Sequence, residues 1–146
     1  MKGRQVRAEG GQITVLMIGF AVVLVMLVGV VVNASHVFLE RRALSSWADG
    51  AVTTATQQVA YDRIYGGDSL DRLPISESAA RDAVVAYAAT HGLAERFAGF
   101  RIAGVDVDPG GEVTVTFVAV VPLVGMGDLG PPVSLTAAAS AVVPLS

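Results

Sequence analysis

Three polar side chains at helical spacing, Asn33, His36 and Glu40, are the first candidates for chemistry in this sequence. Residues three and four apart share one face of a helix, so the three side chains would lie together. A metal site built on His36 and Glu40 would need a third ligand, and the other histidine, His91, belongs to a distant segment. Two interpretations stay open, a collar solvated by headgroups and water or a contact with another helix. We favour the collar and expect no metal site.

Other motifs of catalysis are absent from the sequence. It contains no nucleophile elbow, zinc-protease helix, phosphate-binding loop or dinucleotide fingerprint. The carboxylates Asp106, Asp108 and Glu112 cluster around a predicted turn. Exposure of charged side chains to water at a turn is the ordinary explanation for such a cluster. There is no cysteine, which excludes disulfides, thiolate nucleophiles and cysteine-ligated zinc. We therefore expect a protein that is not an enzyme and needs no cofactor.

The charges argue against nucleic acid as a partner. The chain has 146 residues and a net charge of −3. Beyond Val32 it carries seven basic and twelve acidic residues, whereas binding to phosphate backbones requires clustered lysine and arginine.

Residues Ile13 to Val32 are twenty consecutive positions without a charged side chain, and we call them the apolar segment. As a helix they would be about 30 Å long, which matches the hydrocarbon core of a bilayer. A core helix of this length is too apolar for so small a domain. The sequence therefore predicts a single membrane span, with lipid as a partner.

Two further features bear on how the span is used. The alternative is a signal peptide that is cleaved after Ala34, because small residues precede Ser35. Against it, the apolar segment is longer than the apolar core of a signal peptide, which usually has about 7–15 residues. Cations precede the segment at Lys2, Arg4 and Arg7 and follow it at Arg41 and Arg42. With the terminal amine, the balance predicts a cytoplasmic N-terminus and an extracytoplasmic C-terminal part.

Helix-compatible sequence continues past the membrane, from residue 12 to about residue 60, without proline. At 100° per residue, one face changes from small and apolar, through polar, to aromatic. We predict that this face packs laterally against other helices and supports homo- or hetero-oligomers. Its residues are Gly19, Val22, Met26, Gly29, Asn33, His36, Glu40, Leu44 and Trp47.

The remaining residues predict a small α+β domain. Residues 61–75 contain Gly66, Gly67 and Pro74 and are expected to be a linker that ends at Ser76, a candidate N-cap. Residues 77–91 read as an alanine-rich helix that ends at Gly92.

Period-two alternation then predicts about three antiparallel strands. Val105 and Val107 alternate with Asp106 before a Pro-Gly turn, and a second strand follows from Val113 to Val121. A third strand is expected over residues 133–143, with its serines and threonine on the wetter face. Between the last two strands lies an apolar loop, residues 122–132, expected to tuck against its own sheet.

This layout resembles the TadE/TadG-like proteins of tight-adherence (Flp) pilus assembly, in the form found in actinobacteria. The resemblance is carried by Gly10-Gly11-Gln12-Ile13-Thr14-Val15, by the early span, and by the run from Leu39 to Ala51 (LERRALSSWADGA). It implies a membrane-anchored minor pseudopilin or assembly factor, without catalytic residues, whose partners are other pilus-assembly membrane proteins or pseudopilins. Prepilin-type processing in the wider family cuts after a glycine and expects glutamate at the fifth residue beyond. Gly11 is the candidate site here, with Leu16 at that fifth position.

The predicted organisation is thus a short basic cytoplasmic tail (1–11), a long helix (12–60) that includes the span 13–32, a linker (61–75) and an extracytoplasmic α+β domain (76–146). The predicted function is structural, in a tight-adherence pilus or a related secretion system. Two alternatives stay open: a secreted binding protein released by cleavage near Ala34, and a membrane-bound accessory or sensor protein.

Overall fold

The computed structural model describes residues 7–66, 73–125 and 131–142. The chain divides into two compact units between His36 and Val37, and each unit is described by itself. The cations Lys2 and Arg4, on which the predicted orientation depends, lie outside the described residues.

Helix α1 (Arg7–Gly66) is longer at both ends than the predicted 12–60. The first residues assigned to the linker, 61–66, are helical, because no proline interrupts the segment and a glycine stands at its end. Threonines are tolerated inside α1 since their hydroxyls donate to the carbonyl four residues earlier: Thr53 to Asp49 at 2.8 Å, and Thr56 to Val52 at 2.6 Å.

Helix α2 (Leu73–Thr90) also begins earlier than predicted. Ser76 was expected to be its N-cap but lies inside the helix. Pro74 is the reason: it was interpreted as part of a linker, whereas proline fits the first helical turn, where its missing N–H needs no partner. The predicted stop at Gly92 is confirmed, since this residue has φ 59° and its N–H donates to Ala89. A short helix α3 (Leu93–Arg96), which the sequence did not predict, follows directly.

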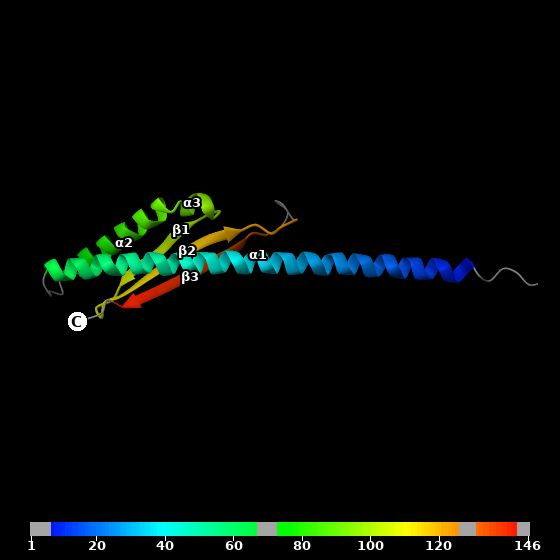
Figure 1. The fold of residues 1–146 in the computed structure, drawn as a ribbon, viewed down its shortest axis with the longest axis horizontal. Coiled ribbons are helices and arrows are strands. Elements are labelled where there is room, and N and C mark those ends of the chain that lie inside the picture. The colour runs from blue at the N-terminus through cyan, green and yellow to red at the C-terminus, as the bar shows by residue number, and fades with distance from the viewer. Residues whose placement is uncertain (1–6, 67–72, 126–130, 143–146) are drawn as a thin grey trace, which may run out of the picture. The chain divides into compact units, whose positions relative to one another are not determined.

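The three predicted antiparallel strands are confirmed as one sheet in the order β1-β2-β3. They are β1 (Arg101–Val107), β2 (Glu112–Val121) and β3 (Val133–Val142). The β1–β2 turn is closed by Asp108, whose carboxylate accepts the N–H of Glu112 at 2.8 Å. The fold is therefore α+β, with a long N-terminal helix before the sheet (Figure 1).

Helices cover one face of this sheet. The alternating residues of β2 that start at Val113 and end at Val121 are all buried, as the period of two requires. Facing them is a stretch of α1, residues 44–59, which we call the core segment; its buried residues are Leu44, Ala48, Ala51, Val52, Ala55 and Val59. Ala80, Val84 and Ala88 of α2 complete the core. Small alanine side chains let these helices lie close to the strands.

Candidate functional site

The apolar segment is exposed along its whole length. Every residue from Gly11 to Val32 is exposed, and no part of its most apolar stretch is buried in the structure. By length and composition this part of α1 is sufficient to cross a membrane. Its exposed side chains include Leu16, Phe20, Val25 and Met26. So large a contiguous apolar surface marks contact with lipid or with protein.

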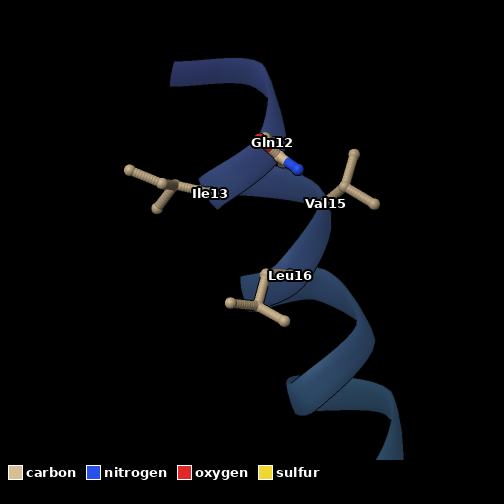
Figure 2. A pocket seen from close by; sticks show the side chains of 4 residues that line it. All are labelled: Gln12, Ile13, Val15 and Leu16. Carbon is tan, nitrogen blue, oxygen red and sulfur yellow. The ribbon is translucent and has the colours of Figure 1, made fainter. Parts of the chain in front are cut away.

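A hollow on this segment is no enclosed site. It is lined by Gln12, Ile13, Val15 and Leu16 of a single helix. Figure 2 shows Ile13 and Val15 pointing to opposite sides of the helix, so these side chains do not converge on a common ligand.

The glycines of the apolar segment face open space. A Cβ atom added at Gly19 or at Gly29 would meet nothing within 4 Å outside the helix's own backbone. Near the end of the segment, the amide of Asn33 donates to the carbonyl of Gly29 at 3.0 Å. That bond satisfies a polar group next to an apolar region, where an unpaired one would be costly.

The structure places the predicted packing face in two different surroundings. Gly19, Val22, Met26 and Gly29 are exposed, whereas Leu44 is completely buried in the chain's own core. Three further positions, Asn33, His36 and Glu40, are half-buried. Trp47 is half-buried as well and packs against the core of its own domain. The outer end of the face is therefore occupied from within the chain.

Trp47 belongs to a cluster of ring systems that joins three helical segments. Its indole lies 6.2 Å from the ring of Tyr87 in an edge-on arrangement, and 5.2 Å from the ring of His91. The rings of Tyr87 and His91 are 4.2 Å apart. The guanidinium carbon of Arg96 stands 5.5 Å from the centre of the indole, within the range of a cation–π contact. We call Trp47, Tyr87, His91 and Arg96 the aromatic cluster.

The hydrogen bonding of the aromatic cluster is local. The ring Nδ1 of His91 lies 2.9 Å from the Tyr87 carbonyl oxygen. Because a carbonyl can only accept, this nitrogen carries the proton. The bond spans one helical turn and fixes the imidazole against the two neighbouring rings.

Gly50 of α1 makes room for Tyr87. A Cβ atom at Gly50 would overlap the Tyr87 hydroxyl oxygen and lie 3.0 Å from the ring carbon Cζ. Burial also raises the pKa of the Tyr87 hydroxyl above its ordinary value of 10.0. The close contact of helix and ring explains both observations.

Sequence reasoning found part of the aromatic cluster. The helix predicted over residues 77–91 contains Tyr87 and His91, and Trp47 was assigned to the packing face of the long helix. Their contact with each other, and with Arg96 of α3, was missed because residues so far apart in sequence carry no periodic signal.

Among the residues that the structure describes, no three metal-binding side chains form a group. The three carboxylates of the β1–β2 turn are exposed, and one of them, Asp108, closes the turn.

Comparison with known proteins identifies the N-terminal third of the chain. Residues 11–58 match the family model described as "Putative Flp pilus-assembly TadE/G-like". The predicted resemblance is thereby confirmed for this segment, and it supports a role in pilus assembly. No curated protein and no solved structure matched the chain. The matched residues include the whole apolar segment and residues 44–58 of the core segment.

Proposed function

We propose that this chain, which carries a TadE/G-like segment at residues 11–58, is a single-pass membrane protein acting as a minor pseudopilin-like component of a tight-adherence pilus or a related secretion system. Its role is structural. The N-terminus is cytoplasmic and the α+β domain is extracytoplasmic.

One observation carries the proposal: a single helix supplies both an exposed apolar segment and the core of a folded domain. Lipid is the solvent that suits twenty uncharged, exposed residues, and a helix satisfies its own backbone there. The domain is thus attached to its anchor by continuous secondary structure. A structural subunit needs such a connection, because a continuous helix transmits force between the membrane anchor and the folded domain.

Gly19, Val22, Met26 and Gly29 are the part of the predicted face that stays available to another helix. Small residues allow two helix backbones to approach closely in lipid, and the open space around both glycines supports this use. The partner is another pilus-assembly membrane protein or a second copy of the chain.

Membrane anchoring is tested by alkaline carbonate extraction of membranes that contain the full chain. We expect the chain in the pellet at full length. Orientation is tested with two single-cysteine variants and a membrane-impermeant thiol reagent, since the chain has no cysteine. Ala138→Cys in the domain should react in intact cells, and Gln5→Cys in the tail should not. Recovery of the chain in the supernatant would contradict the anchor, and the reverse labelling would contradict the orientation.

Helix packing is tested by oxidative crosslinking of Met26→Cys, with Val28→Cys as a matched control on the opposite side of the same helical turn. Both residues are exposed and lie at nearly the same depth. We expect crosslinked products at Met26 only. Equal crosslinking at both positions would remove the face from the proposal.

The pilus role itself is tested by deleting the coding sequence in the producing cell. We expect surface filaments to be lost under the electron microscope and restored by the wild-type chain. The chain with Met26→Arg, which places a charge on the packing face, should restore fewer filaments. Normal filaments in the deletion strain would contradict the role.

Release of a soluble domain after cleavage at Ala34 remains a second candidate, and one observation favours it. The second compact unit begins at Val37, so the cut would leave the packing of the domain intact. Mass spectrometry of the mature N-terminus separates the two functions. It also tests processing after Gly11, which lies within α1.

A further inference from the structure

The folded domain has two distinct ends, defined by the ladder between β2 and β3. Val121 pairs with Val133 at one end, and Glu112 pairs with Val142 at the other. The segment after α3 belongs to the first end, because the N–H of Val120 donates to the carbonyl of Ala98 at 2.8 Å. In Figure 1, α3 and the tip of β2 lie at this same end of the domain.

The chain enters the domain at this first end. Arg96 of α3 contacts Trp47 of α1, and α1 runs from there back toward Val37, which still packs against the core. Val37 is only five residues after Val32, the last residue of the apolar segment. Even fully extended, five residues span about 17 Å. Connectivity alone therefore keeps this end of the domain within reach of the bilayer surface.

Arginine and exposed apolar side chains gather at this end, which we call the arginine end. Phe38 and Leu39 of α1 are 62% and 63% exposed, and Val124, just after β2, is 52% exposed. Four arginines of this end are exposed: Arg41 and Arg42 of α1, Arg96 of α3 and Arg101 of β1. The carboxylates described there are Glu40, which is half-buried, and Glu95.

The opposite end carries the opposite charge. The exposed carboxylates Asp106, Asp108 and Glu112 flank the β1–β2 turn. The domain is thus polarised along the strands, with cations at the end where α1 enters the domain and carboxylates at the opposite end. Because the chain as a whole is acidic, this separation does not follow from composition.

We propose that the arginine end is a lipid-binding surface, which rests on a bilayer and binds the phosphates of anionic phospholipid headgroups. The inference rests on the proposed anchoring. Guanidinium groups bind phosphate oxygens through paired N–H donors, and anionic lipids attract arginines held near the surface. Phe38 and Leu39 supply apolar contact at the boundary between headgroups and acyl chains. This contact holds the domain at one height and tilt instead of leaving it to swing on its anchor.

The experiment uses the full chain in nanodiscs with two single-cysteine variants, Val124→Cys and Val142→Cys. Both positions are exposed valines, at 52% and 62%, on opposite ends of the domain. Each cysteine carries a fluorophore, and the nanodiscs contain a lipid with a quencher on its headgroup. In nanodiscs of phosphatidylglycerol we expect quenching at Val124 to be several-fold stronger than at Val142. Equal quenching at both positions would overturn the proposal.

Two further arms test the role of charge. Nanodiscs of phosphatidylcholine should lose most of the excess quenching at Val124, and so should the double variant Arg41→Gln/Arg42→Gln in phosphatidylglycerol. Both arginines are exposed, so the substitutions leave the core intact, which the unchanged fluorescence of Trp47 verifies. Excess quenching that persists in both arms would overturn the headgroup contact.

Failure of the lipid-binding surface is distinguishable from failure of the anchor. If the chain co-purifies with nanodiscs but both labels are quenched equally, the anchor stands and the headgroup contact is wrong. If the chain does not co-purify with nanodiscs, the anchor itself is wrong, and the lipid-binding surface is overturned with it.

Discussion

The apolar segment and the core segment are parts of one helix, but the first is exposed and the second packs into the core of the domain. In the apolar segment the side chains are mostly large and branched, and all are exposed. In the core segment, buried alanines alternate with a few larger residues at helical spacing, while the other positions, apart from Trp47 and Gly50, are polar. A helix that touches lipid on every side needs no polar face, whereas a helix that packs on a sheet needs one small, apolar stripe. Periodicity, more than hydrophobicity, therefore distinguishes the two.

The glycines show the same difference at the level of single atoms. Gly29 faces open space, while Gly50 holds the ring of Tyr87 against the backbone of α1. A glycine in the apolar segment leaves space for another helix to pack closely, whereas the space at Gly50 in the core segment is already filled by Tyr87.

The largest effect is expected from truncating matched leucines in the two segments. Leu44 is fully buried and Leu24 is 46% exposed. Leu44→Ala should lower the free energy of unfolding of the domain by about 2–5 kcal/mol, because it leaves a cavity. Leu24→Ala should leave that free energy unchanged. Urea unfolding in nanodiscs, followed by the fluorescence of Trp47, measures both, and equal losses would show that the segments are not energetically separate.

The second effect should appear in the core segment and be absent from the apolar segment. Gly50→Ala drives a methyl group into Tyr87, and overpacking of this kind costs about 1–3 kcal/mol, of which better helix propensity returns up to about 1 kcal/mol. Gly29→Ala meets no atom and should not destabilise the domain. The same unfolding measurement applies.

A double variant shows whether the Gly50 effect comes from the ring contact. Tyr87→Phe removes the hydroxyl oxygen that the new methyl group overlaps, so the loss caused by Gly50→Ala should be smaller in the Tyr87→Phe background. An undiminished loss would mean that Gly50 is required for another reason.

Local sequence patterns predicted most of the elements but not their partners. Alternation in β2 and the polar face of β3 appeared as predicted, because period two reports burial directly. The helix ends were misplaced, since Pro74 is compatible with either a linker or a first turn. Helix α1 ends at Gly66 and α2 begins at Leu73, so most of the predicted linker that the structure describes is helical.

The candidate site shows the same limit more sharply. The stripe from Gly19 to Trp47 was read as one intermolecular face, yet Leu44 is buried by the chain's own sheet. Helical periodicity identifies which residues share a face but not what covers them. The exposed residues of the stripe remain a prediction for contacts between subunits.

A smaller effect is expected from Arg96 of α3, whose guanidinium group contacts Trp47 of the core segment. Arg96 lies over the indole of Trp47, and exposed contacts of this type contribute about 0.5–1 kcal/mol. Arg96→Gln should lower the free energy of unfolding of the domain by that amount and alter the fluorescence of Trp47. Arg81→Gln, an exposed arginine of α2, is the control and should do neither. Equal effects of both substitutions would assign the loss to net charge.

The smallest effect is a dependence on alkaline pH that originates in Tyr87 of α2, which packs against Gly50 of the core segment. Burial against α1 raises the pKa of the Tyr87 hydroxyl, so the folded state holds this proton more tightly than the unfolded state. The stabilisation is complete below the unfolded pKa, near pH 10, and is lost as pH rises through the folded value. Above about pH 10 the free energy of unfolding should therefore fall, and in Tyr87→Phe it should fall less. An equal decline in both chains would mean that the contact of Tyr87 with Gly50 does not restrict ionisation, and the close packing that separates the core segment from the apolar segment would not extend to this hydroxyl.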